Sequence, residues 1–301
     1  PENVAEVAVG LELAALAAGD SDPMDHAEVI GGGHPLPHTS LPFLALPTTS
    51  GTGSEVTANA VLTSTEHRVK VSLRGPSMLA TVALVDPALT LSCPPLVTAQ
   101  SGMDALTQCL EPLTSRFATP MVDALATSGL RAASRGLARA VAEGEDLAAR
   151  TDMAFCSLMG GLSLANAKLG AVHGFAGPLG GTTGAPHGAV CAALLRVTTR
   201  TNIRAMAERE PDNPALAKYA LAAEALTGQR PDADPERVGE ALDAWLEDLE
   251  ERLRLPGLAE LGLAEADHDA VVDAAMKGSS MKGNPITLTR DELLQILRDS
   301  A

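Results

Sequence analysis

Two histidines set in apolar, glycine-rich sequence are the side chains best suited to chemistry. His173 lies within residues 171–180 and His187 within residues 185–188, fourteen positions apart. A buried imidazole without a partner is destabilising, so each ring needs either a hydrogen bond inside the core or a ligand. One such histidine is usually a satisfied core residue, and only the pair favours a ligand site.

Asp104 supplies the oxygen ligand that this pair lacks. It lies in the segment Ser101–Glu111, which we expect to open a helix, and Gln108 falls one turn later on the same face. A buried aspartate needs a cation, a metal or the hydrogen bond of a helix cap, and this segment alone is compatible with capping or with ligation. Asp104, His173 and His187 together form an O,N,N set suited to Fe²⁺ or Zn²⁺, with at least one coordination position open for substrate.

A hydroxyl-rich and glycine-rich turn, Pro47–Glu55, follows a predicted strand. Glycines let a backbone approach a ligand closely, and Thr and Ser hydroxyls add donors, so such a turn can cradle phosphate. A solvated loop that uses these residues only as turn formers is the alternative interpretation.

The elements that must position these residues change in character near residue 94. Before it, the pattern predicts a helix over Pro1–Ala18 and two short buried strands, Leu41–Leu46 and Thr81–Val85. After it, long Ala/Leu-rich segments predict helices, with breaks at residues 119–120, 143–146 and 177–188. We therefore expect a partial α/β portion over residues 1–93 and a helical domain over residues 94–301.

The composition excludes several classes of partner. Lys and Arg number 22 against 38 Asp and Glu, a net charge of −16 that repels nucleic acids and anionic membrane surfaces. Aromatic residues are only 2%, too few for base-stacking platforms. The four cysteines include no Cys-x-x-Cys pair, which argues against disulfides and a zinc ribbon and predicts a cytoplasmic protein. The apolar stretch Val4–Ala18 contains two glutamates and is too short to span a bilayer, so we expect neither a signal peptide nor a membrane anchor.

Five ordered motifs resemble the iron-containing (group III) alcohol dehydrogenases. They are the run Pro47–Glu55, Gly-Met-Asp-Ala-Leu at 102–106, Val-His-Gly at 172–174, Pro-His-Gly at 186–188 and Ser-Ser-Met-Lys-Gly-Asn-Pro at 279–285. The resemblance implies a dehydroquinate-synthase-like fold, with an α/β nucleotide-binding domain, an all-α metal-binding domain and the active site in the cleft between them. It further implies Fe²⁺ or Zn²⁺, NAD or NADP, a small alcohol, aldehyde or oxoacid as substrate, and a homo-oligomer.

The same resemblance assigns roles to individual positions. Asp104, His173 and His187 match the family's metal ligands, which are also its catalytic residues. The residues that match the cofactor-binding positions are Thr48, Thr49, Thr52, Gly53 and Lys70. Gln108 stands where the family pattern has a fourth ligand, a histidine; its amide oxygen could ligate, water could take its place, or no metal is held.

Two further positions depart from the family pattern. Gly177 stands where many members carry a histidine proposed to relay protons. The family's Gly-Gly-Gly-Ser pyrophosphate turn is absent, and Gly31–Gly33 is no substitute because His34-Pro35 follows it in place of a helix start. The chain therefore resembles the family from the middle of the nucleotide domain onward, as a fragment of a longer protein or as a shortened relative would.

Three functions follow from these observations. The first is a metal-assisted, NAD(P)-dependent alcohol dehydrogenase or carbonyl reductase. The second is a metal-free enzyme like maleylacetate reductase, which Gln108 favours and the three other ligand types oppose. The third is a shortened non-redox relative that uses the fold for binding alone.

Overall fold

The computed structural model describes residues 10, 13–17, 22–26, 30–36, 39–64, 69–232 and 234–301. Its helices and strands are, in chain order, α2 Pro23–His26, β1 Leu44–Ala45, β2 Asn59–Ser64, β3 Val69–Arg74, β4 Val82–Ala83, α3 Pro95–Thr114, α4 Pro120–Ala142, α5 Leu147–Ala167, α6 Ala171–Thr183, α7 His187–Arg209, α8 Ala215–Thr227, α9 Pro235–Leu253, α10 His268–Ala275 and α11 Arg290–Asp299. Of the helix predicted over Pro1–Ala18, Gly10 and Leu13–Leu16 are helical, Ala17 lies in a turn, and the remaining residues lie outside the described ones.

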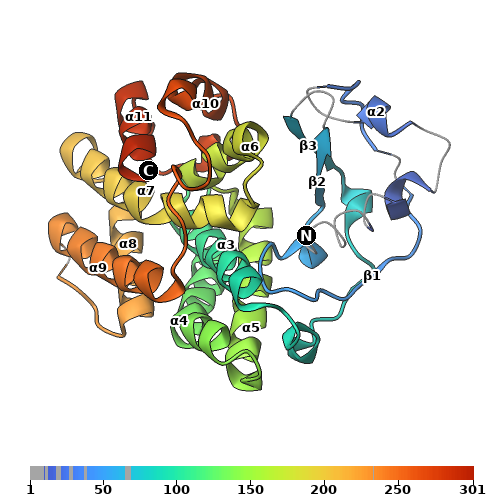
Figure 1. The fold of residues 1–301 in the computed structure, drawn as a ribbon, viewed down its shortest axis with the longest axis horizontal. Coiled ribbons are helices and arrows are strands. Elements are labelled where there is room, and N and C mark those ends of the chain that lie inside the picture. The colour runs from blue at the N-terminus through green and yellow to red at the C-terminus, as the bar shows by residue number, and fades with distance from the viewer. Residues whose placement is uncertain are drawn as a thin grey trace.

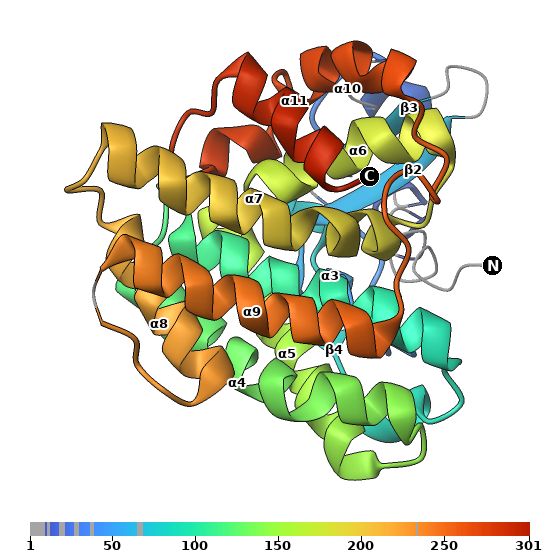
Figure 2. The same ribbon diagram turned by 60° about the vertical axis from the view of Figure 1, so that its left-hand side comes forward.

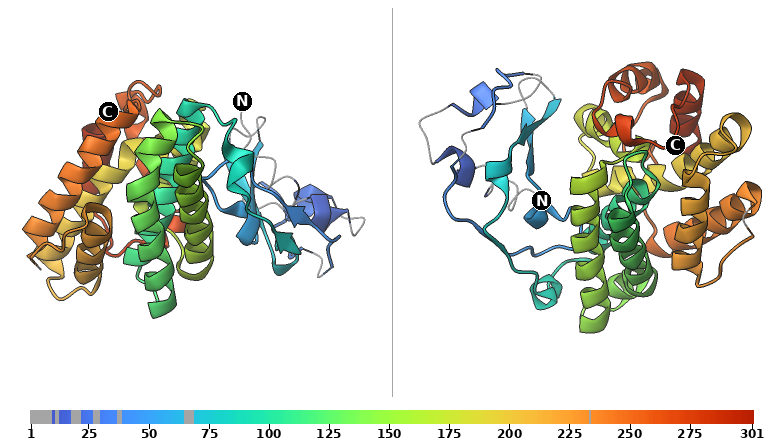
Figure 3. Two further views of the ribbon diagram at one scale, coloured as in Figure 1. Left: turned by 90° about the horizontal axis from the view of Figure 1, so that it is seen from below. Right: turned by 180° about the vertical axis from the view of Figure 1, so that it is seen from behind.

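The helices from α3 onward form one body, with the strands at its side (Figures 1 and 3). Helix α3 crosses the middle of this body, and every residue from Ser101 to Thr114 is buried. Apolar residues from α3 to α11 make one continuous core, which includes Leu106, Phe175 and Leu246. The predicted all-α C-terminal portion is confirmed, since the described residues after Pro95 contain no strand.

The strands form two separate pairs. β1 and β4 run parallel, with Leu44 opposite Val82, whereas β2 and β3 run antiparallel, with Ala60 opposite Leu73. The prediction that β1 and β4 are buried is wrong for most of their residues: Leu44, Val82 and Ala83 are exposed. A two-stranded sheet has no neighbouring strand, and within the described residues only Ala45 is buried in this pair. The β2–β3 hairpin was not predicted.

Most of the predicted helix breaks occur where expected. α4 begins after Thr119, whose hydroxyl accepts the Val122 N–H, and α5 begins after Asp146, whose carboxylate accepts two N–H groups of the first turn. The break predicted to start at Gly177 is wrong, because α6 continues through Pro178 to Thr183. Gly184, which follows the last helical residue, has the left-handed backbone conformation typical of a helix C-terminus. The buried side chains of Phe175 and Leu179 on both sides of this position hold α6 in the core.

Figure 2 shows the long helices α7 and α9 side by side across the helical body. Arg196 of α7 connects them, because its guanidinium donates to Glu250 of α9 at 2.9 Å. No single described helix is long and apolar enough to cross a membrane; α5 and α6 meet the length and composition criteria only as a pair bent by 101°.

Candidate active site

Polar side chains on one face of the buried helix α3 begin the site. Asp104, Gln108 and Glu111 follow one another at helical spacing and are all buried. The expectation that Ser101–Glu111 opens a helix is wrong, because α3 begins at Pro95 and the segment lies in its interior. Asp104 therefore cannot cap the helix, and its carboxylate must find its partners on neighbouring helices.

Those partners come from α6 and α7. Asp104 Oδ1 lies 3.2 Å from His173 Nε2 and 3.6 Å from His187 Nε2. Cys191, one turn after His187 on α7, places its Sγ 3.6 Å from His187 Nε2 and 4.0 Å from His173 Nε2. One donor atom from each of the four residues lies within 4.8 Å of the others. The structure thus brings together the three predicted ligands and adds a sulfur.

Glu111 fixes the orientation of the His173 ring. Its Oε2 lies 2.7 Å from His173 Nδ1, and its Oε1 accepts the Val172 N–H at 2.7 Å. A carboxylate at Nδ1 favours the Nδ1–H tautomer, so the lone pair of Nε2 points toward Asp104 and Cys191. Metal-binding histidines are commonly held in this way by a carboxylate. The arrangement fits a divalent metal ion.

The charges in this cluster shift each other's pKa. Burial raises the pKa of Asp104, but His187 and His173 outweigh it and bring the pKa to about 2. Burial lowers the pKa of His173, but Cys191, Asp104 and Glu111 raise it well above its usual value. Burial also raises the pKa of the Cys191 thiol, and the charges of His187 and His173 reverse this, so that the net shift is downward. Asp104 and Cys191 therefore favour their anionic forms, and His173 favours its protonated form. A bound metal cation would neutralise the two anions and replace the proton on His173.

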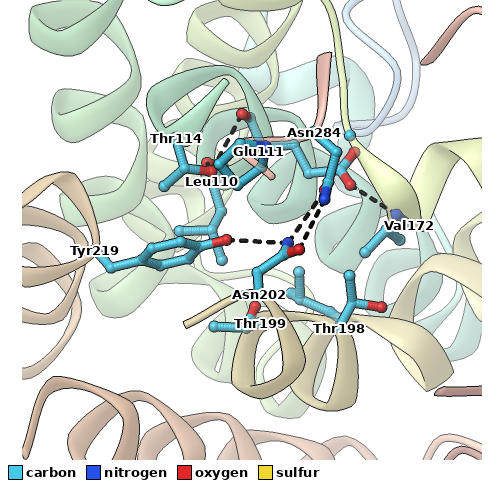
Figure 4. Close-up of a pocket in the computed structure, with 12 residues that line it drawn as sticks. Leu110, Glu111, Thr114, Val172, Thr198, Thr199, Asn202, Tyr219 and Asn284 are labelled. Carbon is cyan, nitrogen blue, oxygen red and sulfur yellow. Dashed lines mark hydrogen bonds between the residues drawn. The ribbon is translucent and has the colours of Figure 1, made fainter. Parts of the chain in front are cut away.

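A buried amide network behind the site holds the start of α6 in place (Figure 4). Asn284 Oδ1 accepts the Ala171 N–H and an Asn202 Nδ2–H, both at 3.1 Å. The Asn284 amide donates to Asn202 Oδ1 at 2.7 Å, and Asn202 also donates to the Tyr219 hydroxyl at 3.3 Å. Asn284 belongs to the last of the five sequence motifs, which thus supports the residues next to His173.

The turn Pro47–Glu55 packs on α5 and on α3, the helix that carries Asp104. Gly53 has a φ of 57°, and a Cβ there would lie 2.6 Å from the Gly161 Cα of α5. A Cβ on Gly51 would lie 2.9 Å from Ser101 of α3. Glu55 at the end of the turn and Thr57 just after it are buried, so this end of the turn is not a solvated loop. In this structure, these two glycines are needed for contact with helices.

Among the other predicted cofactor-binding residues, Thr48 is exposed and Thr49 half-buried. Thr52 is half-buried, and its hydroxyl donates to Ser54 Oγ at 3.1 Å. Lys70 lies on β3, opposite Thr63 of β2. A Cβ on Gly177 would meet nothing within 4 Å, so the described neighbours leave room for a side chain there.

Three residues of this site escaped the sequence analysis as functional positions: Glu111, Cys191 and Asn284. Glu111 could have been noticed seven positions after Asp104 on the same helix face, and Cys191 four positions after His187. Asn284 gave no such signal, because its partners Ala171 and Asn202 lie 113 and 82 positions away.

Comparison with known families identifies the fold that carries this cluster. Two family models match the chain. The one described as Fe-containing alcohol dehydrogenase family, C-terminal, matches residues 98–301, and the one described as iron-containing alcohol dehydrogenase matches residues 12–87. The chain belongs to the iron-containing alcohol dehydrogenase family. This confirms the family resemblance of the five motifs and makes the chain a member of a family of oxidoreductases.

Individual members of the iron-containing alcohol dehydrogenase family agree over most of the chain. Choline dehydrogenase of Bacillus subtilis (strain 168) is 35% identical over 286 residues, which are 90% of this chain and 69% of that protein. The 1,3-propanediol dehydrogenase of Klebsiella pneumoniae is 36% identical over 97% of this chain and 72% of that protein. The crystal structure of a 1,3-propanediol oxidoreductase superposes with a TM-score of 0.86 at 33% identity, over 98% of this chain and 74% of the other. The dehydroquinate-synthase-like fold is thereby confirmed.

Proposed function

We propose that this chain is a metal-assisted, NAD(P)-dependent alcohol dehydrogenase or carbonyl reductase that acts on a small alcohol, aldehyde or oxoacid. One observation carries the proposal: in a member of the iron-containing alcohol dehydrogenase family, Asp104, His173 and His187 turn their donor atoms toward one point between α3, α6 and α7. The divalent ion would be Fe²⁺ or Zn²⁺.

When bound, the metal polarises the oxygen of the alcohol or carbonyl group, and the nicotinamide exchanges a hydride with the adjacent carbon. The protein's own residues hold and shield this chemistry. Glu111 holds Nδ1 of His173, so that Nε2 is the nitrogen that faces the donor cluster, and burial of Asp104 and Cys191 excludes water from one side. His187 is 31% exposed, so we expect substrate to approach past its ring. Gly177 offers no titratable group, so this position cannot relay the proton released from an alcohol.

We infer that the turn Pro47–Glu55 binds the cofactor. Ser101 of α3 touches Gly51 of the turn and lies three positions before Asp104, which supports a nicotinamide site next to the metal. Thr48, Thr49, Thr52 and Gly53 would supply hydroxyl and backbone donors, with Lys70 as a further cofactor contact. This assignment divides the chain into a partial cofactor-binding domain over residues 1–93 and a metal-binding domain over residues 94–301.

The test is NAD⁺ reduction by the full chain after loading with Fe²⁺ or Zn²⁺, measured with a series of small primary alcohols and diols. We expect turnover that chelation abolishes and metal restores. Asp104→Ala should lose both metal and turnover, whereas Asp212→Ala, an exposed aspartate between α7 and α8, should keep them. Turnover that survives complete metal removal would instead indicate the metal-free reductase, and a chain that binds no NADH would indicate the non-redox alternative. The comparisons give no support to either alternative.

A further inference from the structure

The proposed metal site has two candidates for a fourth donor besides Asp104, His173 and His187. Gln108 lies one turn after Asp104 on α3, and Cys191 lies one turn after His187 on α7. The side chain of Gln108 is among the groups that lower the pKa of the Asp104 carboxyl. Its Oε1 is buried and has no hydrogen-bond partner among the described residues. Its amide oxygen is a neutral, hard donor, whereas zinc sites are built mainly from nitrogen and thiolate sulfur, so Gln108 is the weaker of the two candidates.

Cys191 is placed differently. Its Sγ is fully buried and lies 3.6 Å from Nε2 of His187 and 4.0 Å from Nε2 of His173, the nitrogen atoms that also face Asp104. In a tetrahedral zinc site, bond lengths of about 2.0–2.3 Å place neighbouring donor atoms about 3.3–3.8 Å apart. Four of the six distances between the donor atoms, 3.2, 3.6, 3.6 and 4.0 Å, lie close to that range, and the other two are within 4.8 Å.

We propose that Cys191 Sγ is the fourth metal donor of this site and that Gln108 serves as a hydrogen-bond donor that orients Asp104. This inference rests on the proposed metal site. It gives the site two anionic donors, Asp104 and the Cys191 thiolate, which together neutralise a divalent ion. A thiolate among the ligands favours Zn²⁺ over Fe²⁺, because zinc is the softer of the two ions. Substrate would then bind by expanding the coordination to five, as zinc sites can do.

The test replaces the metal of the full chain with Co²⁺ and records the absorption spectrum. Visible ligand-field bands report that cobalt is bound, and a near-ultraviolet sulfur-to-cobalt charge-transfer band reports a thiolate ligand. We expect both signals in the unmodified chain. Cys191→Ser should lose the charge-transfer band while it keeps ligand-field bands, and its Zn²⁺ affinity should fall by about tenfold or more. Cys191→Ala, without any oxygen at this position, should give the same loss of the band.

Two variants serve as controls. Gln108→Ala should keep the charge-transfer band, since the sulfur remains. Cys156→Ser changes another buried cysteine, a free thiol whose Sγ lies 3.9 Å from Cys109 Sγ. This variant should also keep the charge-transfer band. A charge-transfer band that survives in both Cys191 variants, or ligand-field bands without charge transfer in the unmodified chain, would overturn the inference while leaving the metal site intact. A chain that binds no cobalt would contradict the metal site itself, and the inference with it.

Discussion

At the scale of single residues, Glu111 decides which nitrogen of His173 faces the donor cluster. We predict that Glu111→Gln lowers Zn²⁺ affinity about 10- to 100-fold. The reason is that a neutral amide has only one oxygen to accept hydrogen bonds, whereas the charged carboxylate accepts from both His173 Nδ1–H and the Val172 N–H. Competition with a chromogenic chelator measures the affinity, and circular dichroism checks the fold. Unchanged affinity in a folded variant would show that the carboxylate does not orient this ring.

The titration of His173 sets the pH dependence of metal binding. Its pKa is raised well above 6.5, since Cys191, Asp104 and Glu111 together outweigh burial, which lowers it. In the metal-free chain, the protonated ring therefore stabilises the fold fully below pH 6.5, and this stabilisation is lost as the pH rises through the raised pKa. Because a metal must displace the same proton, affinity should rise over that window.

Two measurements check this prediction between about pH 6 and pH 9. Zn²⁺ affinity should still increase above pH 7, and the free energy of unfolding of the metal-free chain should decrease over the same range. Affinity that levels off at the ordinary histidine pKa would contradict the interactions described for His173.

At the scale of elements, the contact between the turn Pro47–Glu55 and α5 depends on two glycines. A Cβ on Gly161 would lie 2.4 Å from the Gly53 carbonyl oxygen, a backbone atom that cannot move without the turn. We predict that Gly161→Ala destabilises the chain by about 1–3 kcal/mol and weakens NADH binding. Denaturant unfolding and NADH fluorescence titration measure the two effects.

Gly177→Ala is the matched control, because it is also a glycine-to-alanine change inside a helix but its Cβ meets nothing within 4 Å. The gain in helix propensity should stabilise the chain by about 0.5–1 kcal/mol and leave NADH binding unchanged. Equal effects of the two substitutions would mean that the turn does not depend on this close approach.

At the scale of the whole molecule, Asn284 connects the C-terminal part of the chain to α6 and α7. It is 2% exposed, and its amide bonds to Ala171, Asn202 and Ile286. We predict that Asn284→Ala lowers the free energy of unfolding by about 2–4 kcal/mol, because several buried polar groups lose their partners. It should also weaken Zn²⁺ binding, because Asn284 accepts the Ala171 N–H at the start of α6, two positions before His173.

The control for Asn284 is Asn166→Ala on the exposed face of α5, where the amide donates only to Leu162 O of its own helix. This change should leave metal affinity as it is. If Asn284→Ala kept full metal affinity, the amide network would support the fold without supporting the site.

The kinds of donor, their order along the chain and the family could be predicted without coordinates. Asp104, His173 and His187 lie in short motifs, and a motif is a local property that survives in the printed order of residues. The long helices followed in the same way from Ala/Leu-rich spacing and from the breaks at residues 119–120 and 143–146.

Other features depended on packing. Glu111 reaches His173 across 62 positions, and Cys191 joins the cluster only because α7 packs against both α3 and α6. The interior position of Asp104 in α3, the continuation of α6 through Pro178 and the exposure of β4 likewise follow from which surfaces meet. Side-chain distances between segments far apart in sequence arise when helices bury their faces against each other, and no spacing rule within one segment encodes them.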